Sequence, residues 1–357
     1  MLKIKRVHDL GLQFTENPHR MVGQDGAFSI PLNGETLWFF GDTLIGTRVP
    51  GESLWYPGGQ WIGPGDMTGK ATYERMLNNS GLLLPRQTGK GGLKNFRYIC
   101  DEQGQLRPLI SLLEHEDPDW IRVWCLHGIR IEKKIYLYFI KVQMLKDGPL
   151  PANFEIIGSG LAVGSTHNWQ FRRIFHLGND ILWPVGQPHF ATAILRHTRE
   201  DWLYAYGVKK DETGRQNCYL ARVRPADIEQ LEAYEYLIGR QPVWGASVTE
   251  AIPLFEGMPN ELSVSFNPYL NAYLAVHSFG TDGRIVGRTA PEPWGPWSKA
   301  QLIWTVQVSN GRPIPYQRLI YAAKEHPSLA DGSGRIIYIT YIEFEEYYPH
   351  LLEVHLG

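Results

Sequence analysis

Three acidic residues of this chain stand at the edges of apolar runs: Asp25 in GQDGAFS, Asp42 in FFGDT and Glu261 in PNELSVS. Pairs of carboxyl groups hydrolyse glycosidic bonds, because one protonates the leaving oxygen while the other activates water or attacks the anomeric carbon. A third acidic group raises the pKa of the proton donor, since like charges resist joint ionisation. The three residues are therefore candidates for catalysis if the fold brings them together.

Each of these residues also has a simpler interpretation. Asp25 precedes Gly26, and Asp-Gly is a common turn pair. Asp42 follows an apolar strand pattern, where an aspartate can end the strand and bond local backbone. Glu261 can be a solvated charge at a strand entry. The choice depends on the elements that position these side chains.

Those elements are expected to be strands. The chain has 357 residues with 12 Trp, 18 Tyr, 14 Phe, 37 Gly and 24 Pro, a composition typical of many short strands joined by turns. A hairpin with a strongly apolar second strand recurs five times, and its copies begin at Ala27, Trp120, Phe190, Leu262 and Ser328. Weaker strand pairs lie between the copies, but only LLEVHLG follows the last one. The N-terminal KIKRVHDLGLQF can supply the missing strand.

The pattern predicts an all-β fold: a five-bladed β-propeller that forms a single domain over residues 1–357, with the last blade closed by the N- and C-terminal strands. The rival fold is a pair of β-sandwiches. Two sandwiches would need a linker near the middle of the chain, whereas the long stretch without strand pattern lies between Leu44 and Met76. Only PADIEQLEAYEY, near Pro225, suggests a helical turn.

Propeller geometry brings the start of each inner strand, the end of the second strand and the start of the third to one face. Asp25 and Asp42 should then be near neighbours, because adjacent strands lie about 5 Å apart. The residues that we expect to bind substrate at this face are Asn78, Asn79, His189, Asn260, His326, Trp55 and Arg75. Tyr56 and Trp61 are further candidates for stacking on sugar rings, Glu325 also falls at this face, and Asp117 and Asp119 are expected in a solvated loop.

The nearly balanced charge favours a neutral or weakly charged substrate, as a carbohydrate would be, over nucleic acid or a membrane as partner. The net charge is −2 without long charged runs, and no stretch approaches the ~20 apolar residues of a membrane span. The N-terminus shows no apolar signal region, so we expect a cytoplasmic protein unless a leader has been removed. The cysteines, Cys100, Cys125 and Cys218, are spaced too widely for a zinc site and are expected as free thiols. No cofactor is expected; a structural Ca²⁺ is compatible with an oxygen-rich channel, although no ligand spacing argues for it. The oligomeric state stays open.

Five segments carry a resemblance to a known family. They are GQDGAFSIPLNGETLWFFGDTLIG, MLNNSG, NELSVSFNPYLNAYLAV, GRTAPEPWGPWS and YAAKEHPSL, in order from Gly23 to Leu329. Together they resemble the family catalogued as domain of unknown function 4185. The resemblance implies a five-bladed propeller glycosidase, with broader similarity to arabinanase, xylosidase, levanase and invertase propellers and, in some members, cleavage of D-arabinofuranose polymers.

The resemblance makes Asp25 and Asp42 the leading catalytic candidates. In the wider propeller glycosidases the Asp that acts as general base opens the first inner strand, which corresponds to Asp25, and the Glu that acts as general acid opens the third. This chain differs there: its third inner strand opens with His189, and Glu261 opens the fourth. The resemblance therefore leaves the identity of the acid open.

Three functions fit these observations. The first is a glycoside hydrolase that acts on a furanoside or a related oligosaccharide. The second is a non-catalytic carbohydrate-binding propeller, since a fold does not determine a function. The third is a glycoside phosphorylase, which would need Arg75, Arg122 and Lys324 to gather around phosphate.

Overall fold

The computed structural model describes residues 2–49, 53–55, 73–146, 153–197, 199–258, 260–307 and 317–357. The expected positions Tyr56 and Trp61 lie outside the described residues. Within the described part of the chain, strands account for nearly all regular structure and helical residues form only short 3-10 turns. Two of these turns, Pro225–Asp227 and Leu231–Ala233, lie where the sequence suggested a helical turn. No helix among these residues is long and apolar enough to cross a membrane.

The first two large sheets follow the chain order from one edge strand to the other. In the first sheet the order is β3 (Phe28–Pro31), β4 (Glu35–Phe40), β7 (Ser80–Pro85) and β8 (Arg97–Tyr98). The second sheet has β9 (Ile121–Ile131), β10 (Lys134–Met144), β11 (Phe154–Ser165) and β12 (Arg172–Arg173), with β13 (Trp183–Pro184) paired to β11. All of these pairs are antiparallel.

The third and fourth sheets repeat this arrangement. The third contains β14 (His189–His197), β15 (Trp202–Lys210), β16 (Gln216–Val223), β17 (Glu235–Gly239) and β18 (Val243–Gly245), and β19 (Phe255–Glu256) also pairs with β16. The fourth contains β20 (Ser263–Asn267), β21 (Ala272–Ser278), β22 (Arg284–Ala290) and β23 (Gln301–Thr305).

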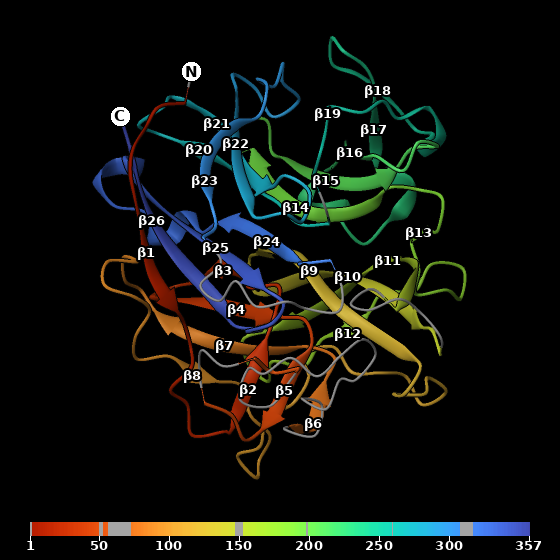
Figure 1. Ribbon diagram of the computed structural model, residues 1–357. Coiled ribbons are helices and arrows are strands. Elements are labelled where there is room, and N and C mark those ends of the chain that lie inside the picture. The colour runs from red at the N-terminus through yellow and green to blue at the C-terminus, as the bar shows by residue number, and fades with distance from the viewer. Residues whose placement is uncertain are drawn as a thin grey trace.

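The last large sheet joins the two ends of the chain. Its order is β24 (Ile320–Glu325), β25 (Ile336–Glu343), β26 (Pro349–Leu356) and β1 (Ile4–Leu12). Strand β1 therefore supplies the missing fourth strand, and Figure 1 shows it running beside β26. The first strand of this sheet begins at Ile320, earlier than the expected start at Ser328, because residues 327–329 form a 3-10 turn.

The middle strands of the large sheets are buried on both faces, which explains the continuous apolar strands of the sequence. In β4, Leu37 and Phe39 pack into the core against the second sheet, while Trp38 and Phe40 pack against the last sheet. Side chains alternate across a strand, so a strand with both faces covered is apolar throughout. Full burial of such a side chain contributes about 1.5–3 kcal/mol.

A smaller sheet lies beside the first one and carries the turns that matter for function. It consists of β2 (Met21–Gln24), β5 (Thr43–Gly46) and β6 (Tyr73–Leu77), in the order β2-β5-β6. Figure 1 shows these strands at the foot of the view, next to β7 and β8. The chain passes from β2 into β3 and from β4 into β5, so two short turns connect the small sheet to the first large sheet.

Candidate functional site

Asp25 and Asp42 lie in those two turns and are tied together through the backbone. The Gly41 amide donates to the Asp25 carbonyl oxygen at 3.0 Å, and the Asp25 amide donates to the Asp42 carbonyl oxygen at 3.4 Å. Gly26 has a φ of +82°, a conformation that glycine adopts readily. A Cβ on Gly41 would lie 2.5 Å from Asp25 Oδ1, so the absence of a side chain there makes room for the carboxyl group.

Two phenol groups hold the Asp25 carboxylate. The Tyr321 hydroxyl donates to Asp25 Oδ2 at 2.7 Å, and the Tyr347 hydroxyl forms a second hydrogen bond. Burial raises the pKa of Asp25, whereas the two phenols and the Lys324 charge oppose that rise by stabilising the ionised form.

Asp42 has a different environment. Trp124 Nε1, from β9, donates to Asp42 Oδ1 at 2.9 Å. Burial, followed by repulsion from the Asp25 charge, raises the pKa of Asp42 to about 7, and the Arg122 charge opposes this rise. A carboxylic acid with this pKa is partly protonated at neutral pH, as a general acid requires.

Glu261 reaches the same region from the segment that precedes β20. Its pKa is raised by burial and by the Asp25 charge, while the Lys324 charge lowers it. Its carboxylate receives no hydrogen bond from the described part of the chain, and its side chain is partly exposed. It is therefore available to a ligand.

Lys324 completes the group. It is only 2% exposed, and its Nζ donates to the Ala322 carbonyl oxygen at 2.8 Å. Nζ also lies 4.3 Å from the centroid of the Phe28 ring, close enough for a cation–π interaction. Burial lowers the pKa of Lys324 to about 8, although the Glu261 and Asp25 charges oppose the decrease.

We call Asp25, Asp42, Glu261 and Lys324 the carboxylate cluster. Its three acids come from the first and fourth sheets and its lysine from the last, so sheets distant in sequence meet here. The three acidic side chains are partly exposed although they are desolvated enough to have raised pKa values. Solvent-reachable carboxyl groups in a low-dielectric setting are able to exchange protons with a bound molecule.

Sequence comparison decides the family. The model of the domain of unknown function DUF4185 matches residues 12–353. The chain belongs to the DUF4185 family. A search of curated proteins found no match.

Two solved structures share the fold of this DUF4185 chain. A candidate hydrolase from Bacteroides ovatus is 15% identical with a TM-score of 0.65, over 96% of this chain and 87% of that one. CoXyl43, a GH43 β-xylosidase/α-arabinofuranosidase from a compost microbial metagenome, solved with xylotriose, is 12% identical with a TM-score of 0.51, over 100% of this chain and 95% of that one. These similarities concern the fold, which is all-β and of the β-propeller type.

The residues expected to bind substrate in the DUF4185 chain differ in how far their polar groups are engaged. Asn79 is fully buried; its amide donates to the Ile110 and Val123 carbonyls, and its Oδ1 accepts from the amides of Leu109 and Ile110. Asn79 thus fastens two segments of backbone. The neighbouring Asn78 is partly exposed, and its buried Oδ1 has no partner among the described residues.

The two histidines also differ. His326 directly follows β24, where its ring stacks on Trp38 and its two nitrogens bond Ser29 Oγ and Thr340 Oγ1, both at 2.7 Å. His189 opens β14 and is partly exposed, and its Nδ1 has no partner among the described residues. Burial lowers the pKa of His189 to about 4, so its ring is neutral at pH 7.

The remaining expected residues are engaged in part by protein atoms. Asn260 Oδ1 accepts from Gln216 Nε2 at 3.1 Å. Trp55 stacks on Phe344, and its Nε1 donates to the Phe344 carbonyl at 2.8 Å. The exposed Arg75 donates to the Leu106 carbonyl oxygen at 2.7 Å.

Four further charged residues that the sequence singled out are not part of the carboxylate cluster. Asp117 and Asp119 are exposed, as expected of a solvated loop. Arg122 is buried and bonds the Pro118 carbonyl. Glu325 accepts from Ser265 at 2.9 Å, and burial raises the pKa of Glu325 to about 7.

Sequence reasoning missed four residues of this site: Trp124, Tyr321 and Tyr347 were not singled out, and Lys324 was considered only as a phosphate ligand. The available sign for Lys324 was its place in the apolar run of YAAKEHPSL. A lysine in such a run is either exposed or buried beside charged partners, and the second case would have indicated a functional site. The two tyrosines carry no such mark among 18 in the chain.

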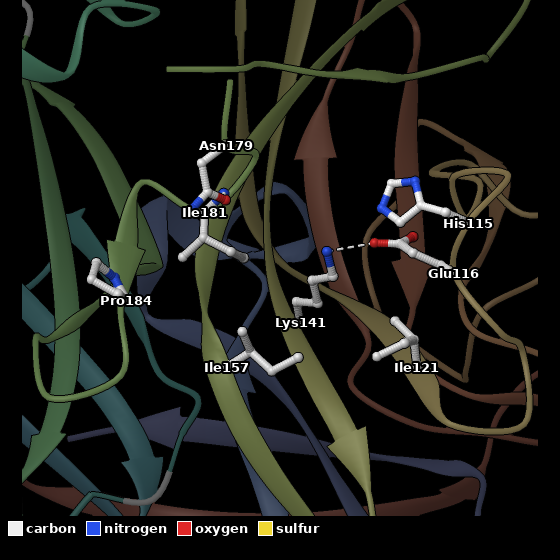
Figure 2. Close-up of a pocket in the computed structure, with 8 residues that line it drawn as sticks. All are labelled: His115, Glu116, Ile121, Lys141, Ile157, Asn179, Ile181 and Pro184. Atoms are coloured by element: carbon white, nitrogen blue, oxygen red, sulfur yellow. Dashed lines mark hydrogen bonds and ion pairs between the residues drawn. The ribbon is translucent and has the colours of Figure 1, made fainter. Parts of the chain in front are cut away.

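A separate group of charges lies on and beside the second sheet and borders a cavity of about 360 Å³ (Figure 2). Arg173 bonds Glu116 and Asp180 at 2.7 Å each, and Lys141 Nζ lies 2.5 Å from Glu116 Oε1 and 3.3 Å from Asp180 Oδ1. We call these four residues the ionic network. Hydrogen bonds from the two cations lower the pKa of Glu116 to about 2 even though burial opposes them.

One set of possible metal ligands occurs among the described residues: Glu343, Glu346 and His350 lie within 4.8 Å of one another. His350 Nε2 bonds Glu346 at 2.6 Å, and Arg318 bonds Glu343 at 2.8 Å. These contacts within the protein account for the grouping. The set shares no residue with the carboxylate cluster. It therefore gives no support to a structural Ca²⁺ among the cluster's oxygen atoms.

Proposed function

We propose that this DUF4185 protein is a glycoside hydrolase that acts on a furanoside or a related oligosaccharide, built on a five-bladed propeller whose last blade joins both chain ends. The observation that carries the proposal is the convergence of three partly exposed carboxyl groups, one with a pKa of about 7, on a single cluster. The strand order of the five large sheets and the apolar cores between successive sheets support the five blades.

The environments of the carboxyl groups suggest their roles. Asp42 protonates the leaving oxygen, because its pKa keeps a proton available near pH 7. Asp25 acts on the anomeric carbon or on water, since two phenols and a lysine favour its ionised form. Glu261, which receives no hydrogen bond from the described residues, holds a sugar hydroxyl or the attacking water. Asn78 Oδ1 and His189 Nδ1 have no hydrogen-bond partner among the residues that the structure describes, so Asn78 and His189 are the binding residues with polar groups left to recognise hydroxyl groups.

A phosphorylase is less well supported. Arg75 donates its guanidinium to the Leu106 carbonyl and Arg122 bonds the Pro118 carbonyl, so both of these cations are engaged by backbone. Lys324 is buried between carboxylates that would repel a phosphate.

The test is a panel of 4-nitrophenyl furanosides and pyranosides together with furanose and xylose oligosaccharides. We expect wild-type protein to release 4-nitrophenol or reducing ends from at least one member. Asp25→Asn should lower kcat/KM by at least about 10³-fold, as expected when a nucleophile or base is removed. The control is Asp117→Asn, an exposed aspartate outside the carboxylate cluster, which should retain wild-type activity.

Two outcomes would overturn the proposal. One is hydrolysis by Asp25→Asn at the wild-type rate. The other is a wild-type protein that binds members of the panel in calorimetry but releases no product from any, which would favour a carbohydrate-binding propeller. Product release that requires inorganic phosphate would instead identify a phosphorylase.

A further inference from the structure

We propose that Lys324 is a positioning residue that decides which of the three carboxyl groups carries the proton: it keeps Asp25 and Glu261 ionised and leaves the proton to Asp42. This inference rests on the proposed function and deepens it by dividing the roles among the acids.

The backbone of β24 fixes the lysine in place. Tyr321 pairs with Ile342 and Lys324 pairs with Thr340, so β24 has an extra residue over this interval and bulges. Ala322, inside the bulge, has a φ of +60°. Bulges redirect side chains out of the regular alternation. Tyr321 and Lys324, on either side of this bulge, both lie at the carboxylate cluster. The Tyr321 hydroxyl donates to Asp25 at 2.7 Å, and the Phe28 ring beside Lys324 Nζ follows Asp25 closely in the chain. The next residue, Glu325, donates its amide to Ser263 Oγ at 2.7 Å, which holds β24 against the segment that carries Glu261.

Contacts with the protein already occupy part of the surroundings of the Lys324 ammonium group. One N–H bonds the Ala322 carbonyl, and the Phe28 ring lies 4.3 Å away. An ammonium group has three donors, so at least one is free to point toward the carboxylates. The side chain is 2% exposed, which weakens solvent screening of its charge.

The groups that face Lys324 come from four parts of the fold. Asp25 lies in the turn before β3, and Glu261 precedes β20. The Lys324 charge also lowers the pKa of two histidines, His127 of β9 and His326 after β24. The lysine charge favours the ionised forms of both acids and the neutral forms of both rings. Because both rings are neutral at pH 7, they bring no positive charge to the carboxylates that Lys324 faces.

Asp42 is treated differently. Its pKa is raised by the Asp25 charge and lowered by Arg122 and by the hydrogen bond from Trp124, with no contribution from Lys324. The Tyr347 phenol also interacts with Asp42, but it carries no charge at neutral pH. Three nearby carboxyl groups do not all ionise readily, because like charges in a low-dielectric site repel. The lysine offsets that repulsion for Asp25 and Glu261, while the ionised Asp25 raises the pKa of Asp42. The proton is thus directed to Asp42 by a charge that acts through Asp25.

Two variants test this idea through the pH dependence of kcat/KM, measured on the most active 4-nitrophenyl glycoside of the panel. In Lys324→Met, Asp25 and Glu261 should take up protons at higher pH, and the loss of the Asp25 charge should lower the pKa of Asp42. The acidic limb of the profile then moves to higher pH, the alkaline limb moves to lower pH, and the active pH range narrows. At pH 5 the variant should lose on the order of tenfold more activity, relative to its own maximum, than wild type loses.

Lys324→Arg is the conservative partner. It keeps the positive charge, so both limbs should stay at their wild-type positions even if kcat falls through the change of shape. A purely structural lysine would lower kcat in both variants without moving either limb. Unmoved limbs in Lys324→Met, or limbs that move equally in the two variants, would overturn the proposal.

A measurement without substrate separates this inference from the proposed function. The carboxyl ¹³C signals of Asp25, Asp42 and Glu261, assigned through the corresponding amide variants, are titrated in wild-type protein and in both lysine variants. We expect Asp42 to be the last of the three to ionise in wild type and in Lys324→Arg, and to lose that place in Lys324→Met. If Lys324→Met does not fold, wild type alone decides: a cluster in which Asp25 or Glu261 ionises after Asp42 refutes the proposal, whether or not any glycoside is cleaved.

Discussion

The carboxylate cluster and the ionic network each gather four charged side chains, but they balance their charges differently. The network pairs two cations with two acids through four contacts of 2.5–3.3 Å. The cluster has three acids and one lysine, and the salt bridges of the described residues include none between them. Similar residue types therefore produce two opposite electrostatic states.

The pKa values express that contrast. Direct hydrogen bonds from Arg173 and Lys141 lower the pKa of Glu116 to about 2, so its charge is permanent at any physiological pH. Burial and a neighbouring carboxylate raise the pKa of Asp42 to about 7, so its charge changes near neutrality. A network with satisfied charges stabilises a fold, whereas an unbalanced cluster supplies a group that can gain and lose a proton.

Exposure separates the two regions as well. The network acids are buried, and Glu116, which lines the cavity in Figure 2, is engaged by Arg173, Lys141 and the Leu113 amide. The acids of the carboxylate cluster are partly exposed, and Glu261 receives no hydrogen bond from the described residues. The cavity therefore borders the network, and none of its lining residues belongs to the carboxylate cluster.

The largest expected effect concerns Asp42, the proposed proton donor. Asp42→Asn should lower kcat/KM on an oligosaccharide by about 10²- to 10⁴-fold, the usual contribution of general acid catalysis. The loss on a 4-nitrophenyl glycoside should be clearly smaller, because nitrophenolate leaves without protonation. Parallel measurements on the two substrates check this. Equal losses on both would show that Asp42 is not the acid.

A comparable effect on stability is expected in the network. Arg173→Met would leave Glu116 and Asp180 buried with Lys141 as their remaining cation, and breaking a buried ion pair costs about 3–5 kcal/mol. Urea unfolding should show this decrease in the free energy of unfolding. The control is Arg20→Met: Arg20 pairs with Glu74 on the surface, where both side chains are more than half exposed, and the expected cost is about 0–1 kcal/mol. Equal costs would remove the distinction between buried and surface pairs.

The sequence predicted much of this fold because each strand pattern is local. Alternation and turn residues placed the strands, and the unmatched N-terminal strand was assigned to the last sheet, where β1 pairs with β26. The proximity of Asp25 and Asp42 also followed from adjacent strands. These features depend on the period of side chains along a strand, which a sequence displays directly.

Lys324 could not be assigned in the same way. Its role depends on the bulge in β24 and on packing between the last, first and fourth sheets, and neither is visible in a local pattern. The fifth hairpin was expected to begin at Ser328, which placed Lys324 outside the strand that carries it. Likewise, nothing local distinguished the buried amide of Asn79 from the partly exposed one of Asn78.

A smaller effect should follow from crowding the carboxylate cluster. In Gly41→Ala the new methyl group would lie 2.5 Å from Asp25 Oδ1 and displace that carboxyl group. Misplacement of a catalytic group by about 1 Å costs up to about 10²-fold, so kcat should fall by about 10- to 100-fold. The thermal midpoint should change by only a few degrees, since the displaced group is a partly exposed side chain. Unchanged kcat would mean that the position of Asp25 does not limit the reaction.

The smallest effect tests the contrast through stability and pH. The pKa of Asp42 is higher in the folded state than in the unfolded state, so its contribution to stability is fully present below about pH 4 and is lost as the pH rises to about 7. Asp42→Asn should therefore be more stable than wild type at pH 8, by about 1–2 kcal/mol after allowance for partial exposure, and equal to it near pH 4. Glu116→Gln should instead be less stable than wild type at pH 8. The folded-state pKa of Glu116 is lowered to about 2, so its contribution is present above about pH 4.5 and is lost as the pH falls toward 2. Urea unfolding of both variants at pH 4 and pH 8 gives the two differences. Differences of the same sign at pH 8 would show that the cluster and the network do not hold their acids in opposite states.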